Sequence, residues 1–242
     1  MYGLIGYPLG HSFSASFFNE KFKKESIDES YSLFPLESIE ELPSLLKGHE
    51  DLKGLNVTIP YKQKVIDYLD DISDEAKKIG AVNVVKITSE KGKLFLKGHN
   101  SDAIGFRNSL LPLLRDDVKK ALVLGSGGAS KAVIYVLKEL GIEVTEVSRH
   151  KRDDNITYDE LTGEVMASHL LIVNTTPLGM WPKIEEAPKI PYQFVTPSHI
   201  LYDLVYNPET TEFMRRGLLN GARVKNGLEM LHGQAIAAWE IW

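Results

Sequence analysis

The 242-residue sequence contains no cysteine. It can therefore form no disulfide and hold no cysteine-ligated metal or cluster, and we predict no metal site. No apolar run approaches the roughly 20 residues that a membrane-spanning helix needs. The formal net charge is −5, whereas a nucleic-acid-binding protein normally presents a net basic face. We therefore expect neither nucleic acid nor a membrane as a partner.

Other features of the composition are ordinary. With 43% hydrophobic and 25% charged residues, the chain can build a core without covalent staples. Its length suits one large domain or two ordinary ones. The first ten residues lack the basic start and long apolar middle of a secretion signal. We expect a cytoplasmic protein, with which the lack of cysteine is compatible.

The most informative stretch is a glycine-rich turn between an apolar run and a helical pattern. Residues 121–124 read as a buried strand, and the turn follows as Gly125-Ser126-Gly127-Gly128-Ala129. Gly125 permits a sharp turn off the strand, and Gly127 lets backbone N–H groups approach a pyrophosphate. The helix that follows points its free N–H groups at that anion. Ser130 takes the third small position of the G-x-G-x-x-G pattern, so the spacing departs from it.

A tight connection without a ligand is the alternative interpretation of this turn, and the flanking strand and amphipathic helix favour the dinucleotide. After the next predicted strand, 143–147, an NAD enzyme usually carries an acid for the ribose hydroxyls. This chain has Ser148-Arg149-His150-Lys151-Arg152 instead. A cation cluster suits a 2′-phosphate, which predicts NADP, with NAD less favoured. A solvated basic loop is the alternative.

Polar side chains in the first half follow predicted strands or begin predicted helices. Ser14 fits a helix N-cap. The alternative is that the hydroxyls of Ser12 and Ser14 both face a polyol or carboxylate ligand. Lys62 lies at a strand-to-helix junction with Thr58, although most helical lysines are simply exposed. Asn83 interrupts an apolar strand, so it satisfies backbone groups or touches a ligand. Asp102 either caps the next helix or is a catalytic carboxylate.

The pattern of apolar residues and turn signals predicts two α/β domains. We expect the last helix to return to the first domain, because no strand follows it. The predicted domains are 1–100 plus 226–242 for substrate and 101–225 as a Rossmann-type unit. Predicted strands cover 2–6, 31–36, 54–59, 80–88, 94–98, 121–124, 143–147, 170–173, 200–205 and 222–224, with a hairpin turn at 90–92. Predicted helices begin at Ser14, Ser38 and Pro60, follow Asp102, and cover 130–140, 209–219 and 227–242.

Several short motifs, in order along the whole chain, resemble those of the shikimate dehydrogenase family. Gly6–Ser14 is similar to G-x-P-x-x-H-S-x-S, and Asn56–Lys62 to N-V-T-x-P-x-K. Gly80–Asn83 and Gly98–Asp102 are similar to G-A-V-N-T and G-x-N-T-D. The set is completed by Asn174–Met180, Asp203–Pro208, and Gly227–Leu231 with Gln234.

This resemblance implies NADPH-dependent reduction of 3-dehydroshikimate to shikimate, a step towards aromatic amino acids. It implies Lys62 and Asp102 as the catalytic pair. The implied substrate-binding residues are Ser12, Ser14, Thr58, Lys62, Asn83, Asp102, Tyr206 and Gln234. The implied cofactor residues are Gly125, Ser126, Gly127, Gly128 and Ala129 at the pyrophosphate, Ser148, Arg149, Lys151 and Arg152 at the 2′-phosphate, Leu204 and Gly227 at the nicotinamide, and Asp74 as a weaker contact.

The chain departs from the family pattern at several positions. Of the family's N-R-T-x-x-R phosphate loop, Ser148-Arg149-His150 keeps only the first arginine in place. Asp153 occupies the position of the second arginine, and Arg152 comes one residue early. The remaining departures are Ala15 for proline, Val84 and Ser101 for threonine, and Ala103 for glycine.

The chemistry requires a proton on the oxygen of a carbonyl that is being reduced. We expect Lys62 to stabilise and protonate that oxygen, and Asp102 mainly to orient Lys62 and a substrate hydroxyl. Two alternatives remain open. One is an enzyme that prefers quinate or accepts both acids. The other is a nucleotide-sensing module without turnover, which would need no proton donor. We expect a small-molecule substrate and a monomer or homodimer.

Overall fold

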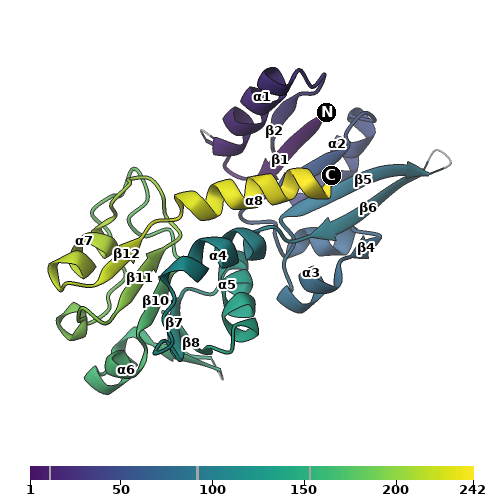
Figure 1. Ribbon diagram of the computed structural model, residues 1–242. Coiled ribbons are helices and arrows are strands. Elements are labelled where there is room, and N and C mark those ends of the chain that lie inside the picture. The colour runs from purple at the N-terminus through teal and green to yellow at the C-terminus, as the bar shows by residue number, and fades with distance from the viewer. Residues whose placement is uncertain (11, 91–92, 153) are drawn as a thin grey trace. The chain divides into compact units, whose positions relative to one another are not determined.

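A computed structural model describes residues 1–10, 12–90, 93–152 and 154–242 of the chain. It divides into two compact units, Met1–Ile104 with Gln234–Trp242, and Gly105–Gly233 (Figure 1). Each unit contains one six-stranded sheet with helices, which confirms the predicted pair of α/β domains. His11 and Asp153 lie outside the described residues, as do residues 91–92 of the predicted hairpin turn.

The first unit contains a mixed sheet with the strand order β2-β1-β3-β5-β6-β4. Strand β1 pairs in parallel with β2 and β3, whereas β5 runs antiparallel to β3 and β6. The strands are β1 (Tyr2–Gly6), β2 (Tyr31–Pro35), β3 (Gly54–Val57), β4 (Asp71–Ile72), β5 (Val84–Glu90) and β6 (Lys93–His99). The helices are α1 (Phe13–Glu25), α2 (Leu42–Gly48) and α3 (Asp74–Ile79), with 3₁₀ turns at Ile39–Glu41 and Lys64–Tyr68.

The second unit contains an all-parallel sheet with the order β12-β11-β10-β7-β8-β9. Its strands are β7 (Lys120–Leu124), β8 (Glu143–Ser148), β9 (Asn155–Thr157), β10 (Leu171–Asn174), β11 (Ile200–Asp203) and β12 (Arg223–Lys225). The helices are α5 (Gly128–Glu139), α6 (Gly163–Ser168) and α7 (Glu212–Leu219), with 3₁₀ turns at Leu111–Leu113, Tyr158–Glu160 and Tyr192–Phe194. This order is that of a doubly wound dinucleotide-binding sheet, in which the order of the strands along the chain reverses between β7 and β10.

Two helices continue from one unit into the other along the chain: α4 (Asp102–Leu110) and α8 (Leu228–Ile241). The last part of α8 belongs to the first unit, as expected for a helix with no strand after it. There Ala235 and Ala238 join the aromatic core around Phe18 and Phe22. The Trp242 indole donates to the Val85 carbonyl at 3.1 Å. The end of α8 is therefore fixed on the first unit's sheet.

Apolar patterning explains the strands that position the site. Residues 121–124 of β7 are fully buried, as expected for a central parallel strand covered on both faces. In α5 the buried residues Ala132, Val133, Val136 and Leu137 recur at helical spacing and form one face. These two elements fix the turn at residues 125–127 between them.

Candidate active site

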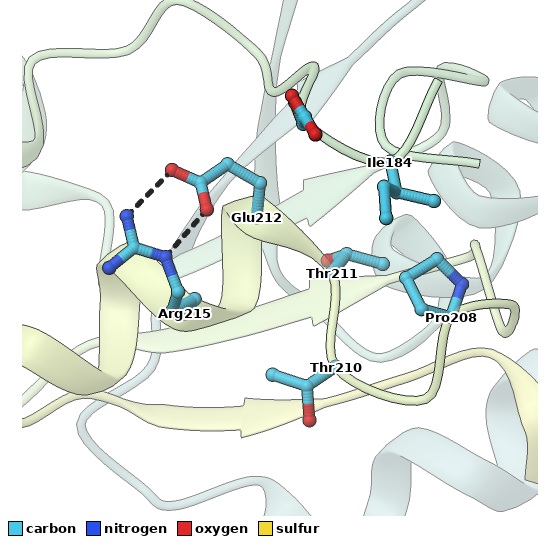
Figure 2. Close-up of a pocket in the computed structure, with 7 residues that line it drawn as sticks. Ile184, Pro208, Thr210, Thr211, Glu212 and Arg215 are labelled. Atoms are coloured by element: carbon cyan, nitrogen blue, oxygen red, sulfur yellow. Dashed lines mark hydrogen bonds and ion pairs between the residues drawn. The ribbon is translucent and has the colours of Figure 1, made fainter. Parts of the chain in front are cut away.

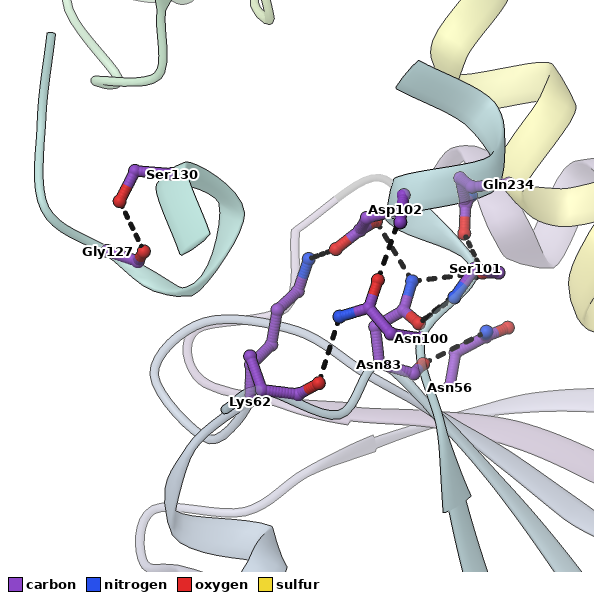
Figure 3. A network of polar contacts seen from close by, with 11 residues as sticks. Asn56, Lys62, Asn83, Asn100, Ser101, Asp102, Gly127, Ser130 and Gln234 are labelled. Atoms are coloured by element: carbon purple, nitrogen blue, oxygen red, sulfur yellow. Dashed lines mark hydrogen bonds and ion pairs between the residues drawn. The ribbon is translucent and has the colours of Figure 1, made fainter. Parts of the chain in front are cut away.

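Lys62 and Asp102, forty positions apart in sequence, form an ion pair in the first unit. The Lys62 Nζ lies 2.6 Å from Asp102 Oδ2 (Figure 3). Lys62 follows β3 in a turn, and Asp102 is the first residue of α4. Their side chains are only 16% and 8% exposed. Water therefore screens this pair less than it screens a surface ion pair.

Asn83 fixes the carboxylate from the other side. Its Nδ2 donates to Asp102 Oδ1 at 2.9 Å, and its Oδ1 accepts from the Ser101 N–H at 2.7 Å. Asn83 is 3% exposed and precedes β5. Each oxygen of the Asp102 carboxylate thus has a separate donor, which holds the plane of the group. Asn83 both satisfies a backbone group and contacts the candidate catalytic residue.

The start of α4 is capped by Asn100 rather than by Asp102. Asn100 Oδ1 accepts from the Ala103 N–H at 3.2 Å, and its Nδ2 donates to the Ala81 carbonyl at 2.9 Å. A side-chain oxygen that accepts from an early helical N–H is the usual cap. Because Asn100 takes this role, the Asp102 carboxylate is available to Lys62. The capping interpretation of Asp102 is wrong.

Ser12 and Ser14 begin α1, but not as predicted. Ser12, with extended backbone at φ −96° and ψ 122°, is the N-cap residue, and its side chain makes no capping bond. Ser14 lies inside the first turn, so the N-cap predicted for it is wrong. Helix capping therefore does not account for either hydroxyl.

Thr58 follows β3, where its main-chain N–H donates to the Ile5 carbonyl at 2.9 Å. The helix predicted to start at Pro60 is wrong, because residues 59–63 form turns before the 3₁₀ helix at Lys64–Tyr68. Tyr61 explains the difference. Its phenol is 2% exposed and donates to the Leu36 carbonyl at 2.6 Å, which draws this segment into the core.

Gln234 and Tyr206 complete the predicted substrate set. Gln234, on α8 in the first unit, accepts a 3.5 Å hydrogen bond at Oε1 from the Ser101 hydroxyl. Tyr206 belongs to the second unit, follows β11 and is 37% exposed. Partial burial raises the pKa of its phenol. The first unit thus brings Lys62, Asn83, Asp102 and Gln234 into one polar network.

The glycine-rich turn lies at the carboxyl end of β7 in the second unit. Gly125 has φ +113°, and a Cβ there would meet Thr175 Oγ1 at 2.7 Å. Gly127 has an ordinary φ of −84° and open space where a Cβ would stand. Ser130 Oγ donates to the Gly127 carbonyl at 2.7 Å, which holds the turn (Figure 3). The arrangement fits a pyrophosphate, because the α5 N-terminus begins beside this open space.

The basic loop after β8 is tied to the acids around it. Lys151 Nζ lies 2.7 Å from Glu160 Oε1, and this hydrogen bond lowers the pKa of Glu160 to about 2. Arg152 pairs with Glu146. Arg149 is exposed and joins no ion pair among the side chains that the structure describes. Of the predicted cations, Arg149 is therefore the one whose charge is not offset by a neighbouring acid.

Asn155 on β9 shapes this loop and was not predicted from the sequence. Its Oδ1 accepts from the Arg152 N–H at 2.6 Å, and its Nδ2 donates to the His150 carbonyl at 2.9 Å. The Ser148 hydroxyl also donates to that carbonyl, at 2.7 Å. Asn155 is 5% exposed. An asparagine after a charged loop gives no sequence signal of this kind.

Three predicted cofactor residues, Leu204, Gly227 and Asp74, lie outside the glycine-rich turn and the basic loop. A Cβ at Gly227 would stand 2.1 Å from the Leu204 carbonyl oxygen, so only glycine fits the approach of these two segments. Asp74, in the first turn of α3, has a 97% exposed side chain that lies 3.9 Å from Lys77 Nζ.

A buried carboxylate, Asp203 at the end of β11, joins three segments of the second unit. Burial raises its pKa to about 6, although its hydrogen bonds oppose the shift. The donors are Asn174 Nδ2 at 2.9 Å, the Val205 N–H at 3.0 Å and Thr211 Oγ1 at 2.6 Å. Asp203 thus fixes the segment that carries Leu204 and Tyr206.

A pocket of about 400 Å³ opens near the start of α7 (Figure 2). Glu212 and Arg215 in its wall already pair at 2.6 Å, which lowers the pKa of Glu212 to about 2. None of the predicted site residues lines this pocket. Among the described residues, no helix is long and apolar enough to cross a bilayer, and no cluster of acids and histidines is suited to a metal.

Fold and site together define a two-domain α/β protein with a dinucleotide-binding sheet and a separate lysine–aspartate site. A family model described as the shikimate dehydrogenase substrate binding domain matches residues 4–85. A relative named shikimate dehydrogenase (NADP(+)), from Clostridium beijerinckii, is 43% identical over 256 aligned residues, covering 100% of this chain and 91% of the relative. The chain belongs to the shikimate dehydrogenase family.

Solved structures agree with this assignment. Shikimate 5-dehydrogenase from Thermus thermophilus, in complex with NADP(H) and shikimate, is 31% identical with a TM-score of 0.86, covering 100% of this chain and 92% of that one. Quinate dehydrogenase from Corynebacterium glutamicum, in complex with NAD, is 26% identical with a TM-score of 0.86, covering 99% and 92%.

Proposed function

We propose that this chain is an NADP-dependent shikimate dehydrogenase, which interconverts 3-dehydroshikimate and shikimate. The observation that carries the proposal is the 2.6 Å pair of Lys62 and Asp102 in a network fixed by Asn83. A nucleotide-sensing module needs no such pair. The curated relative's name and its 43% identity over the whole chain support the same activity.

The residues of the second unit fit the cofactor. When bound, NADPH supplies the hydrogen and the electron pair that the carbonyl carbon gains. Gly125, Ser126, Gly127, Gly128 and Ala129 would hold the pyrophosphate through backbone N–H groups and the start of α5. Ser148, Arg149, Lys151 and Arg152 would hold the 2′-phosphate, Leu204 and Gly227 would line the nicotinamide, and Asp74 would be a weaker contact.

Lys62 acts on the oxygen of the reacting carbonyl. Its ammonium stabilises the negative charge that develops there and then gives the oxygen a proton. In the oxidation direction the neutral amine takes that proton back. Asp102 keeps Nζ in place and accepts from a substrate hydroxyl. Asn83 holds Asp102 so that neither oxygen of the carboxylate rotates away.

The remaining substrate contacts are proposed for hydroxyl and amide side chains, which suit a polyol acid. They are Ser12, Ser14, Thr58, Asn83, Tyr206 and Gln234. We propose residues 1–100 with 226–242 as the substrate domain and 101–225 as the cofactor domain. The cytoplasmic location and the choice between monomer and homodimer stay predictions.

The test is a spectrophotometric assay of the purified chain with shikimate or quinate and with NADP or NAD. We expect the highest kcat/KM with shikimate and NADP. A higher kcat/KM with quinate would replace the proposal by a quinate dehydrogenase. NADP binding without any substrate-dependent change in nicotinamide absorbance, over a panel of cyclic hydroxy acids, would favour the sensing module.

A further inference from the structure

Asn155 is the first residue of β9, the edge strand of the second unit's sheet. Strand β9 pairs in parallel with β8, and Asn155 lies opposite Glu146 in the register. The basic loop, residues 148–152, begins at the end of β8 and precedes β9. Residues 149–152 are exposed, whereas Asn155 is only 5% exposed. A buried amide at this place needs polar partners, and the loop supplies them.

The amide of Asn155 contacts three residues of the basic loop. Its Nδ2 donates to the His150 carbonyl at 2.9 Å and to the Ser148 hydroxyl, and its Oδ1 accepts from the Arg152 N–H at 2.6 Å. A carbonyl only accepts and an N–H only donates, so these partners fix which way the amide is turned. The Ser148 hydroxyl in turn donates to the same His150 carbonyl at 2.7 Å. One side chain thus holds residues 148, 150 and 152 in a single arrangement.

Arg149 lies between two residues that Asn155 holds. The other two cations of the loop pair with acids, whereas Arg149 joins no ion pair within the described part of the chain. A guanidinium binds a phosphate through two parallel hydrogen bonds, which requires a defined direction of approach. Because Ser148 and His150 are fixed, the main chain of Arg149 is fixed between them. Less conformational freedom is then lost when a phosphate binds.

We propose that Asn155 is a positioning residue for the 2′-phosphate of the cofactor, which acts by holding the main chain on both sides of Arg149. The inference rests on the proposed function, because it takes Arg149 as a contact of that phosphate. Asn155 need not touch the cofactor. It serves the one group by which NADP differs from NAD, and other segments of the chain serve the pyrophosphate and the nicotinamide.

The test compares the Kd values of NADP and NAD, measured by isothermal titration calorimetry without shikimate. Asn155→Ala removes all three hydrogen bonds, and Asn155→Leu removes them while nearly keeping the buried volume. With each variant we expect the Kd for NADP to rise about three- to tenfold, because the apparent Kd rises as the binding-competent loop becomes less populated. The Kd for NAD stays within about twofold by the same relation. A role confined to folding would not separate the two cofactors.

Asn220→Ala is the matched control in the same unit. Asn220 is a half-buried asparagine at the end of α7, and its Nδ2 donates to the Arg216 carbonyl at 2.9 Å. Helix α7 packs on β11 and β12, at the opposite edge of the sheet from β9. The loss of this amide should therefore leave the Kd values of both cofactors unchanged.

A double-mutant cycle shows whether Asn155 acts through Arg149. In an Arg149→Ala background, we expect Asn155→Ala to add no further rise in the Kd for NADP. An unchanged Kd for NADP in either Asn155 variant, a parallel rise in the Kd for NAD, or an equal rise in both backgrounds would overturn the inference. The same rise in Asn220→Ala would overturn it too.

Measurements on the wild-type protein separate this role from the proposed function. If the wild type binds NADP no more tightly than NAD, the proposed cofactor fails and the inference falls with it. If it binds NADP tightly but turns over no shikimate, the proposed activity alone fails, because the Kd is measured without substrate. Turnover of shikimate with NADP, together with an unchanged Kd in Asn155→Ala, refutes only the role of Asn155.

Discussion

In the first unit, the ammonium of Lys62 and the carboxylate of Asp102 are mostly shielded from water and share a network with Asn83. Removing one partner from such a buried pair leaves the other charge without compensation, which costs more than the pair itself contributes. The geometry of this site is therefore set before any ligand arrives. A substitution there should act on turnover.

In the second unit, the pairs of Lys151 with Glu160 and of Arg152 with Glu146 are largely exposed. Exposed pairs of this kind contribute about 0–1 kcal/mol, so a phosphate group displaces them at little cost. From this contrast we expect the charges of the first unit to serve the chemistry and the cations of the second unit to exchange their acidic partners for a ligand. Substitutions in this loop should act on cofactor affinity and on salt dependence.

Apart from the loss of Lys62 itself, the largest fall in kcat is expected for Asp102→Asn. In either orientation the nitrogen of the new amide would face a donor, the Lys62 ammonium or Asn83 Nδ2, where a carboxylate oxygen now accepts. We expect kcat to fall about 10²-fold, at the lower end for a positioned proton-transfer group. Steady-state kinetics check this, with Asp70→Asn as the control, since Asp70 accepts from the Leu96 N–H outside the site. A kcat within threefold of wild type would remove Asp102 from the catalytic pair.

Arg149→Ala tests the cation loop. Hydrogen bonds to charged groups contribute about 1.5–3 kcal/mol, so we expect the KM for NADP to rise about 10- to 100-fold. The KM for NAD should not change, because NAD has no 2′-phosphate. Lys151→Ala and Arg152→Ala serve as comparisons and should have smaller effects, since an acid already offsets each cation. Equal effects of all three would contradict the special place of Arg149.

Gly127→Ala separates ligand binding from folding in the glycine-rich turn. Its φ is ordinary and no atom stands within 4 Å of a Cβ, so we expect thermal stability to stay at the wild-type value. The added methyl group fills the space proposed for the pyrophosphate, and the KM for NADP should rise about tenfold, the equivalent of one hydrogen bond. Gly48→Ala, also in open space and without a positive φ, at the end of α2, is the control for cofactor binding. An unchanged KM for NADP would place the pyrophosphate elsewhere.

A further prediction concerns the pH dependence of stability. Burial raises the pKa of Asp203 to about 6, so its contribution is full below the unfolded pKa near 4 and is lost as the pH rises through 6. As the pH rises from 4 to 7.5, the unfolding free energy of Asp203→Asn should therefore rise by about 2–3 kcal/mol relative to that of wild type. Urea unfolding of both proteins at these pH values measures the difference. A constant difference would mean that Asp203 has an ordinary pKa.

Patterns in the sequence predicted those parts of the fold that local periodicity controls. The fully buried run at 121–124 and the face of α5 that contains Val133 are visible in the sequence, and the structure confirms both elements. Pro60 was misleading, because the burial of Tyr61 decides the backbone there and the proline does not. The short elements β4 and α3 were not predicted, since two to six residues carry too little periodicity.

The candidate site divides in the same way. The pairing of Lys62 with Asp102 came from the family resemblance, since no spacing rule brings together residues forty positions apart. The pattern around Ser14 favoured a cap, because a serine near a helix start usually is one. Tyr31 and Asn56 were missed as members of the network. A tyrosine in an apolar strand is typical of a core residue, and only the fold places its phenol against Asn56.

The most direct test of the account is the kcat of Lys62→Ala for shikimate oxidation with NADP. Lys64→Ala, an exposed lysine two positions along the chain, is the matched control. If Lys62 serves the reacting oxygen, kcat falls about 10²- to 10⁴-fold while the control keeps wild-type turnover. A Lys62→Ala enzyme that binds shikimate normally and keeps turnover within a few-fold of wild type would contradict the account.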